Sequence, residues 1–122
     1  MKQGLILFGH GSRDPRWVEP FERLAARIHA RAPGLPVRLA FLESIAPDLD
    51  AAAEQLLGEG VTSVHIVPIF LGQGGHVRSD LPLRVDRLRR RYPSIEIRCA
   101  AAIGEDDAVI EALAGFCLRG LA

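Results

Sequence analysis

Cysteines and long apolar runs are both scarce in this sequence. The two cysteines, Cys99 and Cys117, lie too far apart for a CxxC redox or zinc motif, and two alone do not make a secreted disulfide scaffold. No segment approaches the roughly 20 apolar residues that span a bilayer, and no small-residue cleavage site follows the short apolar run near the start. We therefore expect free thiols, no membrane partner and a cytoplasmic location.

An excess of charge is also missing. Fifteen Lys and Arg residues balance fifteen Asp and Glu residues, so the formal net charge is zero. The basic surface of a nucleic-acid-binding protein is therefore absent, which argues against DNA or RNA as a partner. Lys2 is the only lysine, and every other basic residue is an arginine. Arginine suits bidentate pairing with carboxylates and phosphates, although codon bias alone would give the same composition.

What the sequence does contain is the composition of one globular domain. With 122 residues, 48% of them hydrophobic and 25% charged, disorder is not expected, and residues 1–122 are predicted to form a single domain. Four short apolar runs predict strands, and a segment with apolar residues at helical spacing follows each run. The strands are expected at 5–8, 37–42, 64–71 and 95–100, and the helical stripes are Val18, Phe21, Leu24, Ala25 and Ile28; Leu49, Ala52, Ala53, Leu56 and Leu57; Leu81, Val85, Leu88 and Tyr92; and Ile110, Leu113, Cys117 and Leu121. Each stripe is expected to pack against a sheet.

The alternation of strands and helices predicts an α/β fold, a three-layer domain with a four-stranded parallel sheet. The first and third strands are almost wholly apolar, whereas the second and fourth carry Arg38, Glu96 and Arg98. Continuous apolar strands belong at the centre of a parallel sheet, which predicts the flavodoxin-like order 2-1-3-4. Pro68 conflicts with a central strand because it cannot donate to the ladder. A bulge, or an early end of pairing on one side, would accommodate it.

Three side chains suited to metal chemistry follow three of these strands. His10 follows the first strand, Glu43 the second and His76 the third. In the order 2-1-3-4 these strand ends meet at the switch point, the crevice where open parallel sheets bind ligands. Imidazole is the commonest ligand of divalent transition metals, and two imidazoles with one carboxylate leave coordination positions open for exchange. The sequence therefore predicts a site made of His10, Glu43 and His76, although each residue by itself is equally typical of an ordinary loop.

Other motifs favour plainer interpretations. Gly9-His10-Gly11 starts like a dinucleotide fingerprint, but Asp14 stands where the third glycine belongs, so a Rossmann cofactor is rejected. A phosphohistidine mechanism usually has an arginine directly before the nucleophilic histidine. Here that residue is Gly9, which leaves a histidine phosphatase as a remote alternative. The remaining candidates are expected to be solvated or packed side chains or turn glycines: His29, His65, Gly72, Gly74, Gly75, Arg84, Arg87, Arg89, Arg90, Arg91 and Trp17.

The motifs after the strands, taken together, resemble a known family. Along essentially its whole length the sequence is similar to the class II tetrapyrrole chelatases, in particular the short-form sirohydrochlorin cobaltochelatases. The specific parts are Gly9-His10-Gly11-Ser12-Arg13 after the first strand, Leu42-Glu43 after the second, and Pro68-Ile69-Phe70-Leu71 leading through Gly74-Gly75-His76-Val77 after the third. The resemblance implies a chelatase-like half-domain in which His10 and His76 are metal ligands and Glu43 assists in the site.

The reaction implied by the resemblance is insertion of a divalent ion into sirohydrochlorin with release of two protons, in cobalamin- or sirohaem-type biosynthesis. Co²⁺ is expected as the metal substrate, with Fe²⁺ or Ni²⁺ as alternatives, and no cofactor is expected to be permanently bound. The macrocycle is a polycarboxylate, so Arg13 and Arg78 are candidates for pairing with it, and Ser12 and Gly75 are further candidate substrate contacts.

The resemblance also bears on assembly. Long forms of these enzymes carry two such halves in one chain, so a short form is expected to pair with itself as a homodimer that encloses the macrocycle between facing rims. A non-catalytic metal or tetrapyrrole carrier would use the same residues, and the sequence does not separate it from an enzyme.

Overall fold

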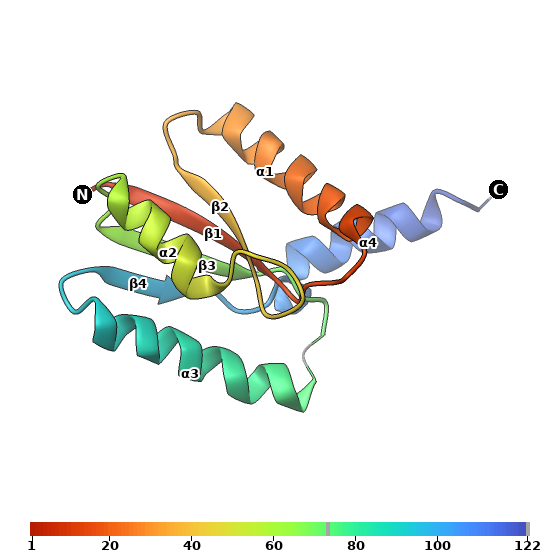
Figure 1. The fold of residues 1–122 in the computed structure, drawn as a ribbon. Helices are drawn as coiled ribbons and strands as arrows, with labels where there is room; N and C mark the ends of the chain where they lie inside the picture. The colour runs from red at the N-terminus through yellow and green to blue at the C-terminus, as the bar shows by residue number, and fades with distance from the viewer. Residues whose placement is uncertain (73, 122) are drawn as a thin grey trace.

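The computed structural model describes residues 1–72 and 74–121, with the backbone alone described for His76. Strands and helices alternate along the chain, as predicted (Figure 1). The strands are β1 (Gln3–Gly9), β2 (Val37–Phe41), β3 (Ser63–Pro68) and β4 (Glu96–Cys99), and the α-helices are α1 (Glu19–Arg31), α2 (Leu49–Gly58), α3 (Gly75–Arg91) and α4 (Asp107–Leu118). Short 3-10 helices, η1 (Pro15–Val18) and η2 (Ile103–Glu105), precede α1 and α4. Within the described ranges no helix has the length and apolarity needed to cross a membrane.

All four strands are parallel and lie in the order β2-β1-β3-β4, which confirms the predicted fold class. An early end of pairing accommodates Pro68. The β3–β4 ladder stops at Ile66 and Cys99, whereas on the other side Ile69 N still donates to Phe8 O at 2.8 Å. Successive residues of a strand present their backbone groups to opposite neighbours, so the nitrogen of Pro68 points to the side where pairing has ended.

Residues of β1 face the two sides of the sheet in alternation. A Cβ on Gly4 would lie 3.1 Å from side-chain atoms of Leu56 and Val61, so this residue faces α2. A Cβ on Gly9 would lie 2.8 Å from Phe21, so this residue faces α1. The α2 side, which α3 also covers, holds the main core, and its most deeply buried side chains include Ile6, Phe8, Leu56, Ile66, Val85 and Leu88.

The α1 side has a smaller core and is only partly covered. Trp17, Phe21 and Phe41 pack together with ring centroids 4.7 to 5.9 Å apart, which seats η1 and α1 over β1 and β2. Farther across the same side, His65 and Val67 of β3 are part-exposed, and Arg98 of β4, paired in register with His65, is exposed. We call His65, Val67 and Arg98 the open side of the sheet.

The last helix, α4, does not pack against the sheet, and the prediction that its apolar stripe would do so is wrong. Every residue of α4 is exposed or part-exposed, and its main contact is with η2. Figure 1 shows the helix leading away from the sheet. The spacing of Ile110, Leu113 and Cys117 correctly predicts a helix with an apolar stripe, but spacing does not determine which surface the stripe meets.

The amino ends of the strands form the edge opposite the predicted site. There Lys2 Nζ donates to Glu59 O at 2.7 Å, and Thr62 N donates to Lys2 O at 2.9 Å. A cavity of about 500 Å³ at this edge is lined in part by His29, Arg38 and Glu59. His29 is exposed at this edge and lies far from the carboxyl ends of the strands. Its exposure agrees with the prediction of a solvated side chain.

His65 makes a testable contribution to the pH dependence of stability. Its Nδ1 is buried and has no hydrogen-bond partner among the described residues, and burial, followed by the nearby Arg98 charge, lowers the pKa of His65 below the ordinary 6.5. The unfolded chain therefore takes up a proton at a pH where the folded chain does not. We expect the free energy of unfolding to fall as pH drops below about 6.5, and to fall less in a His65→Gln variant.

The measurement is urea unfolding of both proteins at pH 7.5 and pH 5.5. The two proteins differ at this residue alone, so the difference between the two pH dependences isolates the contribution of His65. An equal loss of stability in the two proteins would contradict this role.

Candidate functional site

Backbone hydrogen bonds join the segments at the carboxyl ends of β1 and β2, beyond the last paired residues of the two strands. Leu42 N donates to Gly9 O at 2.9 Å, and Glu43 N donates to His10 O at 3.1 Å. These bonds hold the segment that follows β2 against the end of β1 and the residue after it. His10 and Glu43 are thereby brought together at the carboxyl rim of the sheet, as the predicted strand order requires.

The two side chains are in direct contact. His10 Nε2 lies 2.8 Å from Glu43 Oε1, and the side chains are 48% and 56% exposed. An ionised carboxylate only accepts hydrogen bonds, so Nε2 carries the proton of this bond and Nδ1 of a neutral ring keeps its lone pair. A carboxylate in this position orients the imidazole and makes the other ring nitrogen a better metal ligand. The pair therefore offers solvent one metal-binding nitrogen and one carboxylate.

Close packing explains both glycines that flank His10, Gly11 against the segment after β2 and Gly9 against α1 and η1. Gly11 has a φ of +102°, and a Cβ there would overlap the carbonyl oxygen of Glu43. Gly9 is held against Phe21 and Trp17. Only glycine combines the positive φ at position 11 with the absence of a side chain. The two glycines of the Gly-His-Gly motif thus serve packing at the rim.

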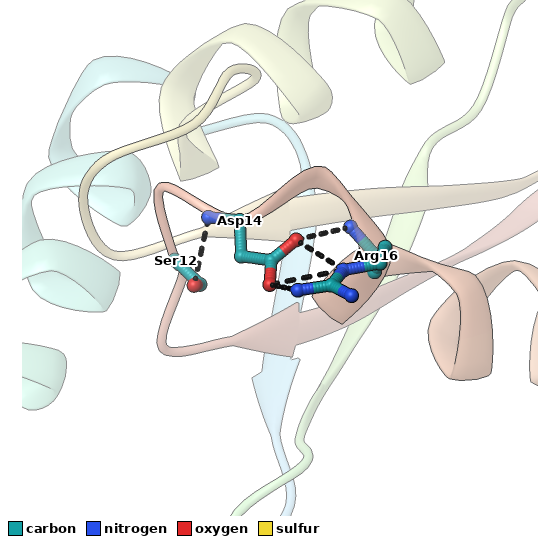
Figure 2. Close-up of polar contacts among 3 residues, drawn as sticks. All are labelled: Ser12, Asp14 and Arg16. Carbon is teal, nitrogen blue, oxygen red and sulfur yellow. Dashed lines mark hydrogen bonds and ion pairs between the residues drawn. The ribbon is translucent and has the colours of Figure 1, made fainter.

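The segment after Gly11 is a tight polar turn (Figure 2). Ser12 Oγ accepts from Asp14 N at 3.1 Å, and the Asp14 carboxylate accepts from both the backbone and the guanidinium of Arg16, at 2.8 to 3.2 Å. Hydrogen bonding to the Arg16 side chain, with a further contribution from its backbone N–H, lowers the pKa of Asp14, which caps η1. Arg16 is therefore committed to the turn, whereas the O–H of Ser12 is still available as a donor.

The two candidate arginines both lie near this rim. Arg13 is exposed in the polar turn, and Arg78 is exposed in the first turn of α3. Within the described ranges neither guanidinium makes a hydrogen bond or ion pair, unlike Arg16, Arg38 and Arg84. Both are therefore available to an anionic ligand.

His76 and its neighbours lie at the start of α3 rather than in a loop. Gly75 is the first residue of this helix and is exposed, and Arg78 N donates to Gly74 O at 3.0 Å. The side chain of His76 lies outside what the structure describes, so its distance from the His10–Glu43 pair stays a prediction. Among the described side chains, no group of three His, Cys, Asp or Glu residues is placed to hold a metal ion.

A cavity beside α3 was not predicted from the sequence. It has a volume of about 320 Å³ and lies between α3 and the end of β4, and its lining includes Arg78, Pro82, Arg89, Cys99 and Glu105. Arg89 is held there by Ile97 O and Asp86, and burial raises the pKa of the Cys99 thiol. No motif connects these residues along the chain, so only the fold could bring them together.

Comparison with known proteins identifies the family of this chain. The sequence profile of the CbiX family matches residues 4–115. The chain belongs to the CbiX family. A putative cobalamin biosynthesis CbiX protein from Marinobacter aquaeolei has a similar structure, with a TM-score of 0.84 and 32% sequence identity, over 97% of this chain and 96% of that one.

Named relatives of this CbiX-family chain differ in their metal. It is 31% identical over 114 residues to a sirohydrochlorin ferrochelatase of Bacillus subtilis, covering 93% of this chain and 43% of the relative. It is 37% identical over 81 residues to a sirohydrochlorin cobaltochelatase of Methanosarcina barkeri, covering 66% of this chain and 62% of the relative. The chain thus spans less than two thirds of the length of these two relatives.

Proposed function

We propose that the chain acts as a sirohydrochlorin chelatase, a lyase that inserts a divalent metal ion into the free macrocycle. The observation that carries the proposal is the His10–Glu43 pair at the carboxyl rim of a CbiX-family chain whose relatives bear that name. An exposed imidazole beside a carboxylate supplies a metal ligand and a proton acceptor, the two groups that the reaction needs. One metal ion and one free macrocycle give one metallated macrocycle and two protons, and no electron is transferred.

His10 and His76 are the proposed ligands that hold the ion while it loses water. The hydrogen bond from Nε2 to Glu43 leaves Nδ1 of His10 for the ion. His76 is the second residue of α3, and this helix follows β3, the neighbour of β1 in the sheet. Two neutral imidazoles leave coordination positions open for pyrrole nitrogens. Protons compete with the ion for both rings, so insertion is expected to weaken in acid.

Glu43 is the proposed acceptor of the pyrrole protons, with service as a third ligand as the alternative. Oε1 is bonded to His10, and the carboxylate is more than half exposed, so a substrate that faces the rim can reach it. A carboxylate held beside the metal ligand can take a proton at the place where the ion enters the ring.

The polycarboxylate periphery of the macrocycle requires local positive charge, because the chain as a whole has none in excess. Arg13 and Arg78 are the proposed partners of these carboxylates, since both are exposed near the rim. The O–H of Ser12 can donate to a carboxylate while its oxygen accepts from Asp14 N. Gly75 presents exposed backbone without a side chain, over which a flat ring can lie.

Assembly and metal use complete the proposal. One rim is open to solvent, so two copies of the chain are proposed to enclose the macrocycle between them. Co²⁺ is the proposed metal substrate, with Fe²⁺ and Ni²⁺ as alternatives, because an imidazole and carboxylate site accepts all three. No permanently bound cofactor is part of the proposed reaction.

The proposal is tested by the absorbance spectrum of sirohydrochlorin. With Co²⁺ in excess and protein in trace amount, we expect the macrocycle to be metallated over many turnovers, at an initial rate proportional to protein concentration. The same mixture without protein is the control, and parallel series with Fe²⁺ and Ni²⁺ rank the metals. A spectral change that stops at one macrocycle per binding site would identify a carrier and would contradict enzymatic insertion.

A further inference from the structure

One residue beside the site has a backbone conformation that is unfavourable for its residue type. Ser44 directly follows Glu43 and has a φ of +70°, and among the described residues no other residue except glycine has a positive φ. In the left-handed region the Cβ of an L-residue crowds the following carbonyl oxygen, which costs free energy. Strain of this kind persists only where the surrounding structure enforces it, and it is concentrated at functional sites.

The side chain of Ser44 does not account for this conformation. Short polar side chains can offset a positive φ by bonding to the nearby backbone. Ser44 is exposed, and its hydroxyl makes no hydrogen bond within the part of the chain that the structure describes. The conformation is therefore imposed by the segments on either side of the residue.

On the amino side of Ser44, the backbone of Glu43 is held at both of its polar groups. Its N–H donates to His10 O at 3.1 Å. Its carbonyl oxygen lies so close to Gly11 that a Cβ on that glycine would overlap it. Glu43 therefore has little freedom to rotate, and its side chain is directed toward His10.

On the carboxyl side of Ser44, the chain soon returns to β2. Pro47 O accepts from Phe41 N at 2.9 Å, so the segment closes on the end of the strand that it left. Only residues 44–46 lie between this closure and Glu43. So few residues reverse the chain only through a sharp turn, and the positive φ of Ser44 provides part of that turn.

We infer that Ser44 is a positioning residue, whose left-handed backbone conformation keeps the Glu43 carboxylate in contact with His10 before a substrate arrives. With a negative φ at Ser44, either the closure at Pro47 or the backbone contacts of Glu43 would have to open, and the 2.8 Å contact with His10 would be lost. A group that is already in place spares the reaction the cost of ordering it. The effect on metal insertion rests on the proposed function, whereas the effect on the His10–Glu43 contact does not.

Two substitutions separate the backbone of Ser44 from its hydroxyl. Ser44→Thr keeps the hydroxyl but adds a β-branch, which disfavours a positive φ, whereas Ser44→Ala removes the hydroxyl without adding a branch. We expect Ser44→Thr to lower the rate of Co²⁺ insertion by the folded protein about 10-fold, and Ser44→Ala to stay within about 2-fold of the parent. The matched control is Ser94→Thr, because Ser94 is exposed in the turn before β4 and has no positive φ. The opposite order of the two Ser44 variants, or a parent rate in Ser44→Thr, would overturn the inference.

The ring of His10 gives a readout that does not require metal insertion. Its contact with Glu43 holds the proton of the neutral ring on Nε2, and without that contact the proton is shared between the two ring nitrogens. We expect the ¹⁵N NMR shifts of the ring in Ser44→Thr to move toward those in Glu43→Ala, while those in Ser44→Ala match the parent. A parent chain that inserts no metal would refute the proposed function and leave this comparison intact. Ring shifts in Ser44→Thr equal to those of the parent would refute the positioning role.

A double-mutant cycle distinguishes positioning from a general loss of structure. Because Ser44 is inferred to act through Glu43, adding Ser44→Thr to Glu43→Ala is expected to lower the insertion rate no further. Urea unfolding of each variant gives the folded fraction to which its rate is referred. Ser44→Gly, which adopts a positive φ without strain, is expected to keep the parent rate. Additive effects of the Thr and Ala substitutions, or a loss of rate in Ser44→Gly, would overturn the inference, and the glycine result decides it even where Ser44→Thr does not fold.

Discussion

Replacing His10 by alanine is expected to lower the initial rate of Co²⁺ insertion into sirohydrochlorin by at least about 100-fold. The substitution removes a half-exposed imidazole and leaves Glu43 without its hydrogen-bond partner. The ion must then shed its water with one fewer protein ligand. The side chain is about half exposed, so its loss opens no cavity in the core, and the free energy of unfolding is expected to change by less than about 1 kcal/mol. Absorbance kinetics and urea unfolding measure the two effects separately.

His29→Ala provides the matched control. His29 is an exposed histidine in the last turn of α1, at the edge of the sheet opposite His10, and the variant is expected to retain the parent rate. His76→Ala is expected to resemble His10→Ala, because both imidazoles are proposed to hold the ion. Insertion at the parent rate in both the His10 and the His76 variants would show that the site has been assigned to the wrong residues.

Gly11→Ala is expected to be the most destabilising single change at the rim, by about 2 to 4 kcal/mol in the free energy of unfolding. The residue has a φ of +102°, where a side chain is strained, and its Cβ would overlap Glu43 O. The β2–α2 segment must move to relieve the overlap. That movement separates Glu43 from His10, so the insertion rate of the folded fraction is expected to fall about 10-fold or more.

Gly58→Ala shows what the same substitution does where space is free. Gly58 is the last residue of α2, and no atom lies within 4 Å of the position of its Cβ. Alanine there is expected to stabilise the chain by about 0.5 to 1 kcal/mol, because it favours the helix. If urea unfolding gave the two alanine variants equal stability, the close approach at Gly11 would not be a constraint on the fold.

The strand order could be predicted because it depends on a property of each strand alone. The strands with charged residues are β2, which contains Arg38, and β4, which contains Glu96 and Arg98, and both lie at the edges of the sheet. The almost wholly apolar strands β1 and β3 lie at its centre. Pro68 looked like a conflict only because the sequence cannot show where a ladder ends. In the structure the β4 side of the ladder ends two residues before it.

The candidate site could be predicted to the level of neighbouring strand ends and no further. Topology places His10 beside Glu43, but their 2.8 Å contact depends on two hydrogen bonds beyond the strands and on Gly11. The apolar stripe that predicts the third helix begins only at Leu81, so the sequence placed His76 after the third strand and did not show that α3 begins at Gly75. The position of α4 away from the sheet could not be predicted either, because an apolar stripe does not determine which surface a helix meets.

The single lysine gives the molecule a chemical handle with a known orientation. Lys2 holds the only ε-amino group in the sequence, and it lies at the amino ends of the strands, beside Glu59 and opposite His10. An amine-reactive dye or sensor surface that couples to this side chain therefore attaches at the edge farthest from the rim. A molecule immobilised in that way is attached at the edge opposite His10 and Glu43, so the attachment itself does not cover the rim.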